Sequence, residues 1–188
     1  MEDYKLYMLL LGCTPAGRHT EQHDIFFTVG KCLKDTIPDI QQFWPGSGPM
    51  HLDAWREVTH TEGYRISVIP KDQEDQSGSG AQRLFFINLG GYKAGEFDEY
   101  HYRMLLVGKD KSEVIRKAKQ TTFYKHTGFK GAESHIDDKY GVDVDDLYEI
   151  TDILPLYIKE KFSLLITEDK ELPEDTFHLG YTVLSKIK

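Results

Sequence analysis

The chain has 188 residues, which is enough for one domain of ordinary size or two small ones. It carries 23 basic and 31 acidic residues, a formal net charge of −8, so we expect neither a nucleic-acid groove nor a polybasic membrane surface. Two cysteines are too few for a disulfide framework.

The first residues of the chain are acidic, whereas a signal peptide begins with basic residues. The apolar run that follows, Leu6 to Leu11, is too short to cross a bilayer. Apolar residues make up 39% of the chain and aromatic residues 12%, which is sufficient for a packed core. We therefore predict a cytoplasmic protein with no membrane partner.

The predicted elements of the first part of the chain are bounded by glycine and proline. Strands are expected at 4–11, 23–29, 51–58 and 64–69, from apolar and aromatic runs. A helix is expected between the second and third strands, where Ile37, Ile40 and Phe43 have helical spacing. Pro38 must then lie in the first turn of that helix.

The same order of elements recurs further along the chain. Strands are expected at 83–89, 101–107, 147–150 and 162–167, with a helix capped by Ser112 after the second of them. An additional strand is expected at 177–184. The residues 71–82 between the two parts include no large apolar side chain and predict an exposed linker.

A sequence repeat underlies this recurrence. At an offset of 78 residues and without a gap, the segment 6–31 aligns with the segment 84–109. Later blocks align at offsets of 84, 92 and 98, and offsets that grow in order indicate loop insertions in the second copy. We predict an α+β fold of two tandem ββαββ repeats, residues 1–70 and 83–188, with mostly antiparallel sheet and packing about a pseudo-two-fold axis.

Polar residues recur at the same places in both copies. In a strand, residues i and i+2 share one face, so each pair presents a carboxylate beside an imidazole. Such groups ligate divalent metals or carry out acid–base chemistry. The pairs are Glu21-x-His23 with His51-x-Asp53, and Glu99-x-His101 with His135-x-Asp137; the candidate metal ligands are His23, His51 and Asp53.

Two further candidates occur in the first copy alone. Arg18 and His19 can neutralise an anionic ligand, whereas the second copy has Glu96 and Phe97 at the aligned positions. Glycines at both ends of this loop have the spacing of a phosphate-binding loop, but no lysine follows them. These glycines are therefore interpreted as sites of positive φ or of close backbone approach.

The first copy contains the pattern LLLG-x4-GRHTEQHD, then FWP, then HLDAW. In this pattern it resembles a bacterial family of domains of unknown function, some of whose members contain the unit twice. The resemblance covers most of residues 1–70 and, more weakly, 83–167, where Glu96, Phe97 and Tyr102 depart from the pattern. The resemblance implies no reaction and no catalytic residues.

The sequence predicts a small-molecule or metal-binding module that uses the repeated Glu, His and Asp groups, with a divalent metal as the candidate cofactor. Two alternatives stay open. The same groups can serve an enzyme in acid–base or metal-assisted chemistry. Alternatively, they bond to loop amides in a structural or interaction domain that binds no small molecule. The sequence is also compatible with a homo-oligomer.

Overall fold

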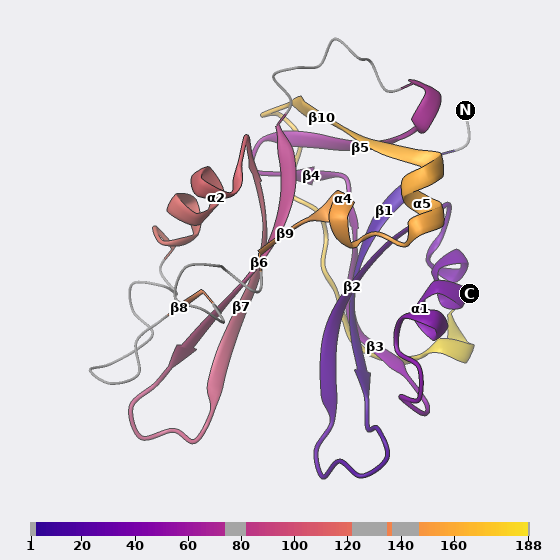
Figure 1. Ribbon diagram of the computed structural model, residues 1–188, viewed down its shortest axis with the longest axis vertical. Helices are drawn as coiled ribbons and strands as arrows, with labels where there is room; N and C mark the ends of the chain where they lie inside the picture. Colours follow the sequence, from indigo (N-terminus) through magenta and orange to yellow (C-terminus); the bar gives the residue numbers. More distant parts are fainter. Residues whose placement is uncertain (1–2, 74–81, 122–134, 137–146, 188) are drawn as a thin grey trace. The chain divides into compact units, whose positions relative to one another are not determined.

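The computed structural model describes residues 3–73, 82–121, 135–136 and 147–187. The chain divides into two compact units (Figure 1). Unit 1 combines Met1–Gln76 with Leu154–Lys188, and unit 2 is Ser77–Ile153. Within the described ranges, no helix is long and apolar enough to cross a membrane.

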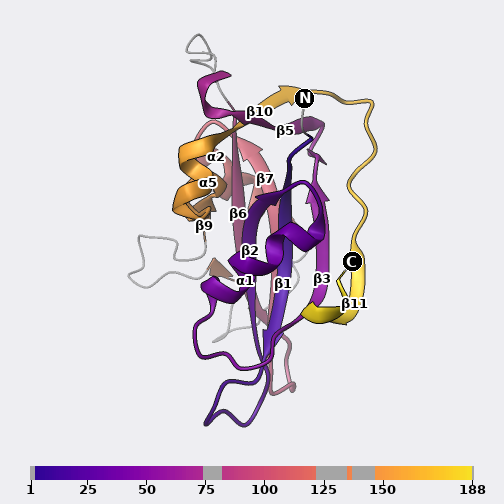
Figure 2. The same ribbon diagram turned by 90° about the vertical axis from the view of Figure 1, so that its right-hand side faces the viewer.

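The main sheet of unit 1 has four strands in the order β11-β3-β1-β2, and each strand is antiparallel to its neighbours. They are β1 (Lys5–Cys13), β2 (Gln22–Gly30), β3 (His51–Val58) and β11 (His178–Val183). Figure 2 shows helix α1 (Ile37–Phe43) lying across one face of this sheet. The core on that face contains Tyr7, Leu9, Leu11, Phe26, Ile40, Leu52 and Ile187.

A second sheet of unit 1 has the order β10-β5-β4. Its strands are β4 (His60–Thr61), β5 (Tyr64–Pro70) and β10 (Phe162–Glu168). Helix α5 runs from Leu156 to Lys161. Short 3₁₀ helices η1, η2 and η3 occupy Leu33–Thr36, Lys71–Gln73 and Leu184–Lys186.

Unit 2 is built on the hairpin of β6 (Arg83–Tyr92) and β7 (Glu99–Gly108). β8 (His135–Ile136) and β9 (Leu147–Glu149) pair antiparallel with β6. Helices α2 (Lys111–Ala118) and α4 (Ile150–Ile153) complete the described part of the unit. Its core contains Phe85, Ile87, Leu89, Leu106, Val114, Ala118 and Leu147.

The hairpins of the two units have the same register. Leu6 is paired with Val29 in the first hairpin and Leu84 with Val107 in the second, so both residues of the second pair lie 78 positions after their counterparts. Gly17 and Gly95, in the two hairpin loops, both have positive φ, as expected for loop glycines. The prediction of an α+β fold with mostly antiparallel sheet is confirmed.

The structure differs from the expected division of the chain at residues 154–188. These residues were expected in the second repeat, but they belong to unit 1, because β10 pairs with β5 and β11 pairs with β3. The cap of α2 also differs: the Asp110 carboxylate accepts the backbone N–H of Glu113 at 2.9 Å, so Asp110 is the N-cap and Ser112 lies inside the helix. Pro38 lies in the first turn of α1, as predicted.

A buried carboxylate joins three elements of unit 1. Asp39 of α1 accepts hydrogen bonds from the hydroxyl groups of Thr28 in β2 and Tyr157 in α5. The Tyr157 bonds are 2.6 and 2.7 Å long, and Asp39 is buried. Burial, and then the hydrogen bond to Asp39, raise the pKa of the Tyr157 phenol.

Replacement of Tyr157 by Phe is expected to lower the free energy of unfolding at neutral pH by about 1 to 2 kcal/mol, because Asp39 loses a donor. Since the folded state holds the phenol neutral, wild-type stabilisation is present in full below about 10, the ordinary tyrosine pKa, and is lost progressively as the pH rises from there toward the raised pKa of the folded state. The difference between wild type and Y157F, measured by urea denaturation, should therefore shrink in alkaline buffer. A difference independent of pH would contradict this account.

Candidate metal centre

The candidate site is arranged around Gly12, near the end of β1. Gly12 is paired with His23 of β2 on one side and with His51 of β3 on the other. Paired residues of adjacent strands carry their side chains on the same face of a sheet. The two imidazoles therefore lie on either side of a residue that has no side chain.

The absence of a side chain at Gly12 makes the arrangement sterically feasible. A Cβ atom at this position would lie 2.3 Å from His51 Nε2 and 2.6 Å from Asp53 Oδ2, closer than real Cβ contacts. The His51 ring and the Asp53 carboxylate thus occupy the space above the Gly12 backbone.

Asp53 is brought to the site by a β-bulge. Leu52 is paired with Leu11 and Ala54 with Leu10, so Asp53 is an extra residue in β3 with no partner in β1. A bulge redirects a side chain and is common beside functional sites. Here it leaves the Asp53 carboxylate on the same side as the two imidazoles, while Leu52 faces the core.

Four side chains converge at this point. Asp53 Oδ2 lies 3.2 Å from His23 Nε2 and 3.4 Å from His51 Nε2. The two oxygens of Glu21, which directly precedes β2, lie 3.4 Å from His23 Nε2 and 3.1 Å from His51 Nε2. Ligand atoms of Glu21, His23 and His51 all lie within 4.8 Å of one another.

Two of the converging atoms make no hydrogen bond. His51 Nε2 and Asp53 Oδ2 are buried and have no hydrogen-bond partner, although each lies within 3.4 Å of other polar atoms of the cluster. Such buried, unbonded polar atoms cost about 1–3 kcal/mol each. Neither atom bonds to a loop amide. Such bonds are what the alternative of a structural or interaction domain predicts for these groups. Their orientation is that of ligand atoms that face a shared centre.

The spacing also suits a metal ion. Zinc binds imidazole nitrogen at about 2.0–2.1 Å, so neighbouring ligand atoms of a tetrahedral zinc site lie about 3.4 Å apart. The four nitrogen–oxygen distances in the cluster lie between 3.1 and 3.4 Å. Small side-chain movements would therefore suffice to admit an ion.

The cluster has one buried side and one open side. The His51 side chain is only 6% exposed, whereas those of His23 and Glu21 are 37% and 42% exposed. The ring of Tyr181 in β11 covers His51, with ring centroids 4.2 Å apart. Cys13, the residue after Gly12 in β1, is also buried. Burial, and then the negative charge of Glu21, raise the pKa of its thiol, so Cys13 is disfavoured as a thiolate ligand.

The remaining predicted residues belong to an exposed loop of unit 1 or to unit 2. Arg18 and His19 are exposed in the loop between β1 and β2. In unit 2, His101 is paired with Gly90, as His23 is with Gly12, but its Nδ1 atom lies 3.0 Å from Asn88 Nδ2. The backbone of His135 also pairs with Gly90. Glu99 is the first residue of β7 and is paired with Tyr92. Asp137 lies outside the described residues.

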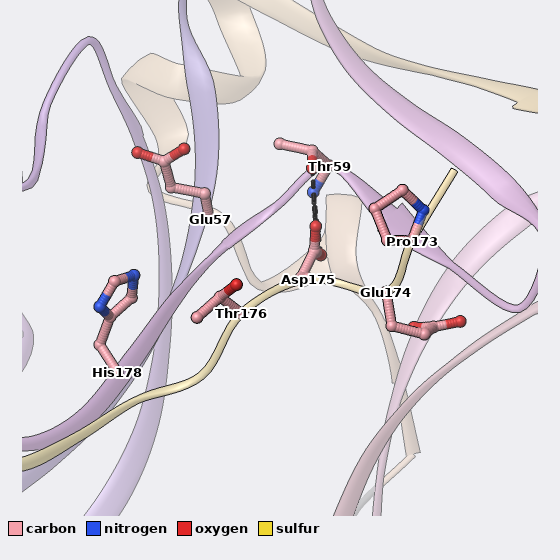
Figure 3. A pocket seen from close by; sticks show the side chains of 7 residues that line it. All are labelled: Glu57, Thr59, Pro173, Glu174, Asp175, Thr176 and His178. Carbon is pink, nitrogen blue, oxygen red and sulfur yellow. Dashed lines mark hydrogen bonds between the residues drawn. The ribbon is translucent and has the colours of Figure 1, made fainter. Parts of the chain in front are cut away.

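A pocket of about 320 Å³ lies elsewhere in unit 1, between the end of β3 and the segment that leads to β11 (Figure 3). Its lining includes Glu57, Asp175 and His178. Asp175 already accepts hydrogen bonds from the backbone of Thr59 and from its hydroxyl group at 2.6 Å, and Glu57 is paired with Lys5 at 2.8 Å. Because these two carboxylates already bond to other segments of the chain, the pocket is a weaker candidate for a ligand-binding site than the cluster.

The chain is similar to a family of domains of unknown function and to a solved structure. A family model described as Domain of Unknown Function (DUF1543) matches residues 18–68, a range that includes the four converging side chains, in agreement with the predicted resemblance to a family of domains of unknown function. The crystal structure of protein Il1583 from Idiomarina loihiensis is similar over 98% of this chain and 99% of that chain, with 23% identity and a TM-score of 0.57. At this identity the likeness extends to the fold alone. None of the curated proteins matches the chain.

Two contributors to the cluster were not predicted from the sequence. Tyr181 belongs to a strand whose partner is more than a hundred residues earlier in the chain, so no local pattern indicates its contact with His51. Gly12 was interpreted only as a backbone position. Its recurrence as Gly90, at the same separation from His101 as Gly12 has from His23, is the signal that would have identified it.

Replacement of Gly12 by Ala is expected to displace the His51 ring, because the new methyl group would overlap Nε2. Overpacking of this kind lowers the free energy of unfolding by about 1–3 kcal/mol. The imidazole NMR signals of His23 and His51 should move in G12A. In the control C13A, whose changed side chain lies on the other face of β1, they should stay in place; unchanged signals in G12A would contradict the packing described.

Proposed function

We propose that unit 1 binds one divalent transition-metal ion through His23, His51 and Asp53, with Glu21 as a fourth ligand. The observation that carries this proposal is the pair of buried, unbonded atoms, His51 Nε2 and Asp53 Oδ2, which face a shared centre. A bound cation would satisfy both atoms and remove the free-energy penalty of leaving them unpaired.

The donor set indicates the kind of ion. Imidazole nitrogen combined with carboxylate oxygen suits zinc, iron, nickel or manganese, whereas calcium and magnesium prefer oxygen ligands alone. Two neutral imidazoles and two carboxylates would balance the charge of a divalent cation. Since the cluster has no thiolate, we expect zinc to be held less tightly than in a cysteine-rich structural site.

The open side of the cluster favours binding of a further ligand at the ion. His23 and Glu21 are partly exposed, so an exchangeable water or a small molecule could reach the metal beside them. This feature also supports the second candidate function, an enzyme that uses the metal as a Lewis acid. Such an enzyme would require, in addition to the metal, a substrate bound beside it.

We also propose that the two units arose by duplication of a ββαββ element. The shared hairpin register supports the duplication. Asn88, which lies against His101, aligns with Leu10 of the first copy, and Glu96 and Phe97 replace Arg18 and His19. The two copies therefore differ in the loop beside the cluster and at the position next to His101.

Titration of chelator-treated full-length protein with Zn²⁺ tests the metal site. Calorimetry should give one zinc per chain, with an affinity that falls as the pH falls, because protons compete for the imidazoles. H51A and D53N should each lose more than about 100-fold in affinity, since loss of an outer-shell partner alone costs 10–100-fold.

The matched control is H178A. His178 lies in the same sheet but is stacked on Trp55, with ring centroids 3.9 Å apart, and is not part of the cluster. Its zinc affinity should equal that of the wild type. Equal affinity in H51A, D53N and the wild type would disprove the metal site.

A further inference from the structure

Three large apolar side chains are exposed along the segment that contains β11. Phe177, Leu179 and Tyr181 are 60%, 78% and 67% exposed. Exposed apolar side chains that form a contiguous row mark binding surfaces more often than scattered ones do. We call these three residues the β11 stripe.

The stripe lies on the same face of the sheet as the metal ligands. Leu179 is paired with Ala54, and Ala54 is paired with Leu10, on the face that carries Gly12 and His51. Phe177 reaches this face as well, because its ring lies 4.8 Å from the Arg56 guanidinium, and Arg56 is paired with Met8. The core cluster that includes Leu52 lies on the opposite face.

The stripe begins at the metal cluster. Tyr181 contacts His51 directly, yet two thirds of its surface remains exposed. The segment from Phe177 to Tyr181 spans at most about 13 Å, at a rise of 3.3 Å per residue. The proposed metal site thus adjoins the apolar β11 stripe, whose length is roughly that of a medium-chain acyl group.

We propose that the metal site binds a small amphipathic ligand, with an anionic chelating head on the metal and a linear apolar tail along the β11 stripe. This inference rests on the proposed function and specifies its ligand class. The head would bind on the open side of the cluster, where Glu21 and His23 are partly exposed. The tail would cover Leu179 and the exposed face of Tyr181.

Hydroxamates of two lengths test this proposal on zinc-loaded, full-length protein. Octanohydroxamate should bind about 50-fold more tightly than acetohydroxamate, as expected if about three methylene groups are buried on the stripe. L179S should reduce this ratio about 10-fold while zinc affinity and acetohydroxamate affinity stay unchanged. The matched control, L156S, changes a leucine of α5 that is also exposed and should preserve the ratio.

The outcomes separate the two proposals. If zinc binds but the two hydroxamates bind equally, the ligand class is wrong and the metal site stands. If the ratio persists in L179S, or if octanohydroxamate binds equally well after zinc is removed, the β11 stripe is not the tail site of a metal-bound ligand. If zinc itself does not bind, both proposals fail.

Discussion

The candidate site depends on the absence of one Cβ atom. Adjacent strands lie about 4.8 Å apart, so the backbones of His23 and His51, on either side of the central strand β1, are separated by about two such spacings. Their side chains can meet only by leaning over β1, and only Gly12 leaves room for them to do so. The bulge at Asp53 then brings a carboxylate into the same space from β3.

This arrangement has an energetic consequence for the free protein. The His51 ring is held on one side by Tyr181 and below by the sheet, while its Nε2 atom has no hydrogen-bond partner. A fold that keeps such atoms buried loses stability that an apolar pair would have retained. Functional sites commonly show this conflict between stability and readiness to bind. By contrast, the buried carboxylate of Asp39, elsewhere in unit 1, accepts hydrogen bonds from Thr28 and Tyr157.

Much of the local structure could be predicted from the sequence, because strand and helix periodicity are local properties. The range of β3 was predicted without error, and α1 has Pro38 in its first turn. The recurrence of Glu, His and Asp in both copies identified all four members of the cluster. Long-range pairing was not predictable in this way. Tyr64 to Ile69 and Phe162 to Thr167 look alike in sequence and were placed in separate repeats, yet they pair with each other, with Ile66 opposite Ile166.

The discontinuity of unit 1 gives its assembly an order in time. Domains generally fold as the chain emerges during synthesis, from the N-terminal side onwards. His23, His51 and Asp53 are made before any residue of unit 2, whereas β11 follows the whole of that unit in the chain. A nascent chain can therefore gather the proposed metal ligands on a three-stranded sheet while the edge of that sheet beside β3 is still unpaired. Addition of β11 would then enclose His51, so that the proposed ion would bind before the surface beside it is complete.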